Sequence, residues 1–264
     1  MRWRTSALVL VAAVALSACG SSSKSNSSSS TSTTASGSGG TLNVFAASSL
    51  TAAFTALGTQ FETAHPGTKV NFNFDSSTIL SGQIQDTPGK ADVFASADQK
   101  NMTKLQTAGV VTGTPTVFAK NQMEIAVEPG NPKHVATVAD LAQRHLIVVL
   151  CASEAPCGKY ADQLLAQDKV TVTPKSRELN ASSTLGKVES GDADAAIVYL
   201  TDVKGAGKDV DGVAIPTSQN VIATLPIAAL KNSKNATLAG EWVNFVTSSS
   251  SEKTLHQQYG FLAP

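Results

Sequence analysis

Paired serines follow two strand-like segments of the sequence, at points where helices are expected to begin. Ser48–Ser49 come after the strand-like Thr41–Ala46, and Ser76–Ser77 come after Lys69–Phe74. The first N–H groups of a helix have no partner within the helix, and the helix dipole places partial positive charge there, so a helix start can bind an anion. A serine hydroxyl adds a further donor. A single serine at such a position more often caps its own helix, so it is the repetition that favours an anion site.

The same strand-to-helix order occurs twice more along the chain. The strand-like His145–Cys151 leads through Ala155–Gly158 into a helical pattern, and Asn180–Ser183 begin another helix, which the strand-like Ala195–Leu200 follows. Alternating strands and helices are typical of α/β folds with mostly parallel sheets. Ligands of such folds bind outside the carboxyl ends of the strands, where helices begin. We therefore expect four helix starts to converge on one ligand.

Two strand-like segments, Met123–Val127 and Thr224–Leu230, are spaced as if they crossed between two halves of the fold. We expect a first lobe made of residues 41–122 and 224–264 and a second lobe made of residues 123–223. Each lobe would hold a mostly parallel sheet flanked by helices, and the two crossing strands would form a hinge.

The N-terminal region has the layout of a secretory signal. A positively charged start is followed by the apolar stretch Ala7–Leu16 and by small residues up to Cys19. Leu16–Cys19 also resembles the bacterial lipobox, which implies a signal peptide at 1–18 and a lipid on Cys19. An ordinary cleaved signal with an incidental cysteine is the alternative. Residues 20–40 are nearly all Ser, Thr and Gly, which predicts a flexible tether. Together with the lipobox resemblance, this implies a lipidated tether at 19–40 and an exported protein anchored to the outer face of the membrane.

Several motifs of the chain resemble those of the molybdate-binding proteins of ABC importers. They are Val44–Thr51, Phe74–Thr78, Ala91–Lys100 and the closing Tyr259–Phe261, and the resemblance runs from about Thr41 to the C-terminus. It implies a periplasmic-binding-protein type II fold that closes on molybdate or tungstate between its lobes. It also implies a monomer that needs no cofactor and delivers its ligand to an ABC permease.

The resemblance also implies which residues hold the oxyanion, by uncharged hydrogen bonds. Ser49 and Ser77 would give hydroxyl and backbone donors from the first lobe. Cys157 and Ala181 would give backbone N–H groups from the second lobe, and Tyr199 would give its phenol.

Three features depart from the family pattern. Ala181 stands where valine is common, and Cys157 replaces a small residue, but both contacts are backbone N–H groups and should be retained. The stretch Asn180–Ser182 lacks an expected acid. A pocket of donors suits a fully ionised oxyanion, because a protonated ligand finds no acceptor in it. Each unsatisfied buried group costs about 1–3 kcal/mol.

Cys151 and Cys157 lie in the loop that should carry one of these donors. Export to an oxidising compartment favours a disulfide between them, and two separate thiols are the alternative.

Composition and motifs exclude several other classes. Lys+Arg number 20 and Asp+Glu number 20, so no net charge favours nucleic acid or a membrane surface, and contact with the membrane would be through the lipid only. The four histidines are scattered without metal-ligand spacing, and no catalytic, dinucleotide or phosphate-loop motif is present, so we predict neither an enzyme nor a metal site. The remaining alternatives are a sulfate, thiosulfate or phosphate binder, an Fe(III) binder, a ligand-sensing domain, or an exported hydrolase of small esters or phosphates.

Overall fold

The computed structural model describes residues 39–264 of the chain. The signal peptide predicted at 1–18, the lipidation site predicted at Cys19 and nearly all of the predicted tether lie outside the described residues. These described residues form one compact unit. Among the described helices, none combines the length and the apolar character that a membrane span requires.

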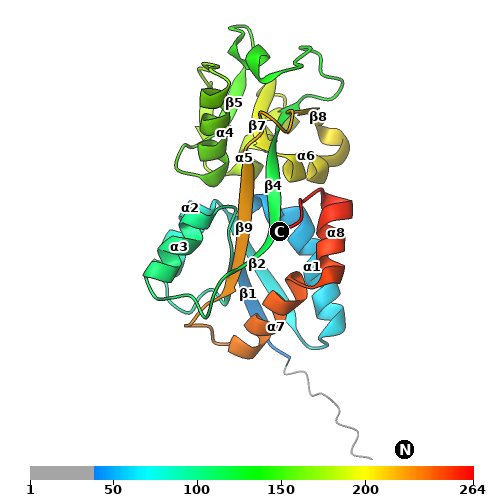
Figure 1. The fold of residues 1–264 in the computed structure, drawn as a ribbon. Coiled ribbons are helices and arrows are strands. Elements are labelled where there is room, and N and C mark those ends of the chain that lie inside the picture. Colours follow the sequence, from blue (N-terminus) through cyan, green and yellow to red (C-terminus); the bar gives the residue numbers. More distant parts are fainter. Residues whose placement is uncertain (1–38) are drawn as a thin grey trace, which may run out of the picture. The chain divides into compact units, whose positions relative to one another are not determined.

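Strands and helices alternate through most of the unit (Figure 1). The strands are β1 (Thr41–Ala47), β2 (Lys69–Asp75), β3 (Val93–Ala95), β4 (Thr116–Val127), β5 (Val148–Cys151), β6 (Ser176–Glu178), β7 (Ala195–Tyr199), β8 (Asp211–Ala214) and β9 (Ile222–Ala229). The α-helices are α1 (Thr51–Ala64), α2 (Ser77–Asp86), α3 (Gln99–Thr107), α4 (Pro156–Gln167), α5 (Ala181–Glu189), α6 (Leu200–Ala206), α7 (Ala236–Val246) and α8 (Ser249–Tyr259). Three short 3-10 helices are η1 (Ser48–Leu50), η2 (Val138–Ala142) and η3 (Gly207–Asp209).

The described strands are hydrogen-bonded in the order β2-β1-β3-β9-β4-β7-β5-β6, and β8 also pairs with β4. Strand β4 pairs with β9 over Thr116–Gln122 and with β7 over Met123–Val127, so it passes from one half of the fold to the other. We call the part with β1, β2, β3 and β9 the first half, and the part with β5 to β8 the second half. The predicted α/β fold with crossing strands is confirmed.

Within each half the strands run in one direction apart from the crossing strands β4 and β9, as expected of mostly parallel sheets. Strand β1 is parallel to β2 and β3, and β5 is parallel to β6 and β7. The pairs that involve β4 or β9 are antiparallel. The physical reason is that the two crossing strands run in opposite directions between the halves and pair with each other.

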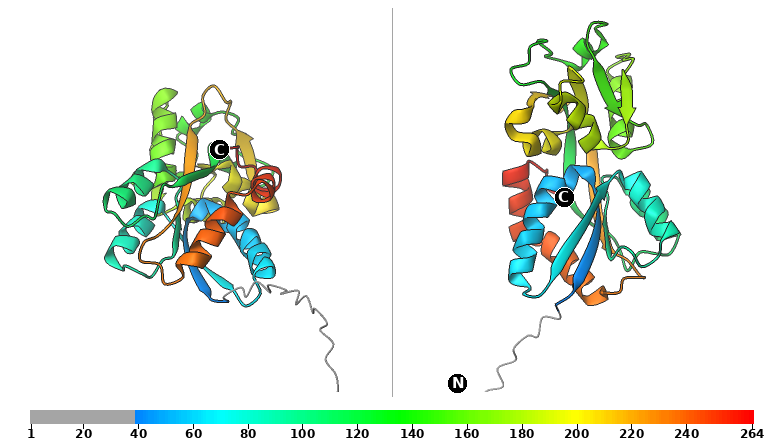
Figure 2. Two further views of the ribbon diagram at one scale, coloured as in Figure 1. Left: turned by 60° about the horizontal axis from the view of Figure 1, so that its bottom comes forward. Right: turned by 180° about the vertical axis from the view of Figure 1, so that it is seen from behind.

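Helices cover both faces of the first half (Figure 2). Along β1, Leu42 and Val44 belong to the same buried cluster as Phe54 of α1, whereas Phe45 packs in a second cluster with Leu80 of α2. This alternation follows from the two-residue period of a strand. Each fully buried side chain of this size contributes about 1.5–3 kcal/mol.

The second half is built in the same way. Val148 and Leu150 of β5 cluster with Leu164 of α4, and Val149 clusters with Leu185 of α5 on the other face. With both faces covered, every residue of β5 is buried, as expected of an internal parallel strand. In both halves helices begin close to the ends of parallel strands: η1 follows β1 directly, and α2, α4 and α5 each begin a few residues after the strand that precedes them.

Candidate functional site

A cavity with about 190 Å³ of empty space, which includes open solvent, lies where these four helix starts meet. It is lined by all five residues predicted to hold the ligand, which are Ser49, Ser77, Cys157, Ala181 and Tyr199. Each of the five is buried, and none is more than 5% exposed. The other lining residues are Ala47, Ser48, Asp75, Ser76, Ala97, Pro156 and Asn180.

Ser77 is the first residue of α2, and its hydroxyl is held in a defined orientation. The preceding Ser76 caps the helix by accepting a hydrogen bond from the N–H of Thr78 at 3.3 Å. The Oγ of Ser77 accepts a hydrogen bond from the N–H of Ala97 at 2.9 Å. Because this neighbour fills an acceptor position of the hydroxyl, Ser77 remains free to donate its proton toward the cavity.

Two other hydroxyls at the cavity have no hydrogen-bond partner within the described part of the chain. They are the Oγ of Ser49, on η1 of the first half, and the Oη of Tyr199, at the end of β7 in the second half. A buried hydroxyl without a partner costs about 1–3 kcal/mol. Two such groups that line one cavity from opposite halves therefore mark a place where a ligand can accept hydrogen bonds from both.

Tyr199 is held as a neutral donor. Burial raises the pKa of its phenol well above the usual range, and the nearby Tyr160, Asp202 and Asp98 add to the rise. The phenol keeps its proton at physiological pH and can donate it to an anion.

The second half also presents backbone donors. Cys157 is the second residue of α4, after Pro156, and Ala181 is the first residue of α5. The side chain of Asn180 caps α5 by accepting a hydrogen bond from the N–H of Ser183 at 2.9 Å. N–H groups at the first positions of a helix have no partner within it, so those of Cys157 and Ala181 are available to a ligand.

Of the two alternatives for the cysteines, the structure has the disulfide. It joins Cys151, at the end of β5, to Cys157 in the first turn of α4, with their Cα atoms 5.8 Å apart. Gly158 makes this close approach possible, because a Cβ atom at that position would lie 2.0 Å from the carbonyl oxygen of Ala152. The backbone around Cys157 is therefore fixed from both sides.

Hydrogen bonds connect the two halves beside the cavity. The Oγ1 of Thr78 donates to the carbonyl oxygen of Glu154 at 2.7 Å, and the Nδ2 of Asn180 donates to the Oδ1 of Asp75 at 2.8 Å. The structure thus has the halves in contact around the cavity.

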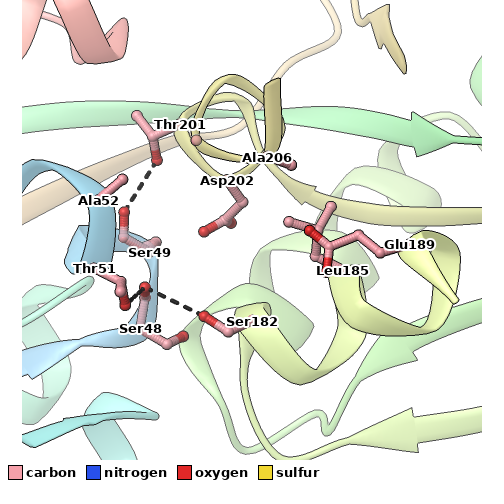
Figure 3. Close-up of a pocket in the computed structure, with 11 residues that line it drawn as sticks. Ser48, Ser49, Thr51, Ala52, Ser182, Leu185, Glu189, Thr201, Asp202 and Ala206 are labelled. Atoms are coloured by element: carbon pink, nitrogen blue, oxygen red, sulfur yellow. Dashed lines mark hydrogen bonds between the residues drawn. The ribbon is translucent and has the colours of Figure 1, made fainter. Parts of the chain in front are cut away.

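A larger cavity, with about 550 Å³ of empty space that includes open solvent, adjoins the first one at Ser48 and Ser49 (Figure 3). Two more contacts between the halves border it: the hydroxyls of Ser182 and Thr201 lie 3.4 Å from the carbonyl oxygens of Ser48 and Ser49, respectively. The carboxyl group of Asp202 lies in the same space.

Asp202 also supports Tyr199. Its Oδ2 accepts a hydrogen bond from the backbone N–H of Tyr199 at 2.9 Å. Burial raises the pKa of Asp202 to about 7, although this hydrogen bond acts in the opposite direction.

One acidic residue, Asp75, is also among the lining residues of this cavity. The Oδ1 of Asp75 accepts hydrogen bonds from the N–H of Ser76 and from the amide of Asn180, and these compensate for its partial burial. The sequence did hold a signal for this residue: Asp75 is the last residue of β2, directly before the paired serines.

No group of three or more His, Cys, Asp or Glu residues suited to a metal ion occurs within residues 39–264. The cavity is thus a set of hydrogen-bond donors with one carboxylate at its edge.

Comparisons with known proteins agree on the kind of protein. The sequence pattern of the family described as bacterial extracellular solute-binding protein matches residues 42–262. The molybdate-binding protein ModA of Mycobacterium tuberculosis is 40% identical over 222 residues, which are 84% of each chain.

Solved structures share the fold. The periplasmic molybdate-binding protein of Azotobacter vinelandii superposes with a TM-score of 0.73 at 20% identity, over 84% of this chain and 99% of that one. The sulfate-binding protein SubI of Mycobacterium tuberculosis superposes with a TM-score of 0.71 at 19% identity, over 84% and 86% of the two chains. The predicted type II periplasmic-binding fold is confirmed.

Proposed function

We propose that this chain captures molybdate or tungstate between its two halves and delivers the oxyanion to an ABC permease. The chain belongs to the family of bacterial extracellular solute-binding proteins. Membership of this family agrees with the prediction of a binding protein rather than an enzyme.

The observation that carries the proposal is the pair of buried hydroxyls without partners, Ser49 Oγ and Tyr199 Oη, at one cavity. Each can donate one hydrogen bond to an oxyanion. Ser77 would donate a third from its hydroxyl, and the N–H groups of Cys157 and Ala181 would complete the set from the second half. A fully ionised tetrahedral oxyanion accepts at every oxygen and so satisfies all of these donors.

Neutral donors can hold an anion in this cavity without a buried positive charge. An anion among oriented dipoles avoids the desolvation cost of a buried ion pair. The donors come from both halves, so the ligand binds the closed form better than an open one and shifts the population toward closure. We assign residues 41–122 and 224–264 to one lobe and 123–223 to the other, because β4 changes partner between Gln122 and Met123.

A second candidate is the capture of a protonated oxyanion such as hydrogen phosphate. Asp75 favours it, because a carboxylate at the edge of the cavity could accept the ligand's proton. Sulfate has no proton at neutral pH, so Asp75 gives it no such advantage.

Isothermal titration of residues 40–264 with molybdate, tungstate, sulfate and phosphate, each separately, tests the proposal. We expect molybdate and tungstate to bind at least tenfold tighter than sulfate and phosphate. Sulfate binding as tight as molybdate would overturn the ligand assignment, and tighter phosphate binding would establish the second candidate.

The lipid anchor is part of the proposal. The lipobox-like Leu16–Cys19 and the Ser/Gly-rich residues 20–40 support a protein tethered to the outer face of the membrane. We expect it to act there as a monomer, as its family resemblance implies. A Cys19→Ala variant should leave the membrane fraction of the producing cells, and unchanged partition would contradict the anchor.

A further inference from the structure

The hydrogen bond between Asn180 and Asp75 connects the two halves at the cavity itself. The Nδ2 of Asn180, the residue before α5 in the second half, donates to the Oδ1 of Asp75, the last residue of β2 in the first half. Both residues line the cavity. They are 105 positions apart in the chain, so this bond depends on how the halves meet.

The surroundings of Asn180 fix which end of its amide faces Asp75. The Oδ1 of Asn180 faces both the N–H of Ser183, at 2.9 Å, and the hydroxyl of Ser183, at 3.0 Å. A backbone N–H can only donate, so the amide oxygen must lie on that side and the NH₂ group must face the carboxylate. One side chain therefore caps α5 with its oxygen and joins the halves with its nitrogen.

An aspartate at position 180 could perform only the first of these tasks. Asp and Asn cap helices about equally well. A carboxylate at position 180 would, however, face the carboxylate of Asp75 and have no proton to donate to it. The pair therefore needs an amide on one side and a carboxylate on the other.

Asp75 suits this bond although it lines an anion site. A bond to a carboxylate is roughly twice as strong as one between neutral groups. The N–H of Ser76, 2.7 Å from the same oxygen, helps to stabilise the charge. Asp75 is thus already provided with donors from each half.

We propose that Asp75 and Asn180 form a latch that closes the two halves and positions the first N–H of α5 on the oxyanion. Ala181, whose N–H is one of the proposed donors, directly follows Asn180 and is 2% exposed. The latch thus orients the start of α5 at the moment the cavity closes. This inference rests on the proposed function, because its binding readout is an oxyanion.

The test exchanges the two side chains. Asn180→Asp keeps the cap and opposes two carboxylates, so we expect molybdate binding to weaken by about 10–100-fold. The double variant Asp75→Asn with Asn180→Asp removes the opposition of two carboxylates. It should recover only part of the lost binding, because the oxygen of residue 75 that faces position 180 also accepts the N–H of Ser76. Asp75→Asn alone keeps a neutral hydrogen bond and should lose less than Asn180→Asp does.

Ser182→Ala is the matched control, because it removes a longer contact between the halves from the same turn of α5. We expect it to change the Kd less than threefold. The pH profile adds a readout that a general loss of structure would not give. Two facing carboxylates can share a proton, so the deficit of Asn180→Asp should shrink as the pH falls from 8 to 5.5.

Failure of the latch and failure of the proposed function give different results. Suppose that the parent binds molybdate. The latch is then overturned if Asn180→Asp binds molybdate as tightly as the parent does, or if the exchange variant binds it no tighter than Asn180→Asp does. If the parent binds none of the four oxyanions, the proposed function fails and small-angle X-ray scattering decides the latch. Asn180→Asp must then have a larger radius of gyration than the parent and the exchange variant, and equal radii overturn it.

Discussion

The hydroxyl oxygen of Ser77 accepts a hydrogen bond from the backbone N–H of Ala97, 2.9 Å away. This bond ties the start of α2 to the segment after β3 and leaves the hydroxyl proton for the cavity. Both residues are almost fully buried. Ser77 thus has a structural partner and, as we propose, a ligand partner at the same time.

Ser77→Ala should weaken both ligand binding and the stability of the fold. We expect molybdate binding to lose about 1–3 kcal/mol, and the free energy of unfolding without ligand to fall by a similar amount because the N–H of Ala97 is left buried and unpaired. Titration calorimetry and urea unfolding measure the two quantities. Ser81→Ala is the control: Ser81 is buried on the same helix but does not line the cavity, so stability should fall and affinity should not. Parental affinity in Ser77→Ala would contradict its role as a donor.

Tyr199→Phe should weaken ligand binding without lowering the stability of the unliganded protein. The hydroxyl of Tyr199 is buried without a partner, so its removal should leave the unliganded protein equally or more stable. Molybdate binding should weaken by about 1–3 kcal/mol, because the ligand loses a donor. Thermal unfolding without ligand and calorimetric titration test the two halves of this prediction.

Tyr160→Phe serves as its control. The ring of Tyr160 packs edge-on to that of Tyr199, but the residue does not line the cavity. Its affinity should match the parent's. A Tyr199→Phe protein that is clearly destabilised would show that the hydroxyl has a structural partner after all.

The strand-to-helix pattern of the sequence predicted helix starts that converge, and in the structure they surround one cavity. Residues Thr41–Ala46 were expected as a strand and form β1, which extends to Ala47. The pattern predicts such elements because buried strands and amphipathic helices have different periods. Ser49 and Ser77 could then be placed at helix starts, and the resemblance to a family supplied the other three residues.

What the sequence did not reveal depends on tertiary structure. The contact of Asp75 with Asn180 exists only when the halves meet, so no local pattern of the sequence could indicate it. Cys157 and Ala181 would act through backbone N–H groups, which leave no mark in the choice of side chain. The direction of the two crossing strands was also left open, because it is set by how β4 and β9 pair between the halves rather than by local pattern.

Removal of the disulfide should loosen both the fold and the site. Replacing Cys151 and Cys157 together by serine should lower the free energy of unfolding by about 2–3 kcal/mol, as expected for a short closed loop. Molybdate affinity should fall as well, because the first turn of α4 loses one of its fixed points.

The reductant provides a control for that double variant. Both cysteines are buried, so dithiothreitol should not reduce the disulfide of the folded parent. It should lower the thermal midpoint of the parent only because it reduces the disulfide once the protein has unfolded. The double variant should not respond to dithiothreitol. An unchanged midpoint and affinity in the double variant would show that Gly158 and the surrounding packing fix the loop without the bridge.

Asp202 should make the stability of the unliganded protein depend on pH. Its folded pKa of about 7 lies above the ordinary value of 3.8, because burial disfavours the charged form. The folded state therefore holds a proton that the unfolded state has lost, and stability falls as the pH rises from about 4 to about 7. Above the folded pKa both states are ionised and the slope ends. Thermal midpoints between pH 5 and 8 should fall more steeply in the parent than in Asp202→Asn, which keeps an oxygen acceptor for the N–H of Tyr199. The remaining slope would come from groups such as Glu124, whose pKa burial also raises. Asp192→Asn is the control: its exposed carboxyl has a lowered pKa, so its contribution is lost only below pH 4 and the slope between pH 5 and 8 should equal the parent's. Equal slopes in the parent and in Asp202→Asn would assign the pH dependence to other groups.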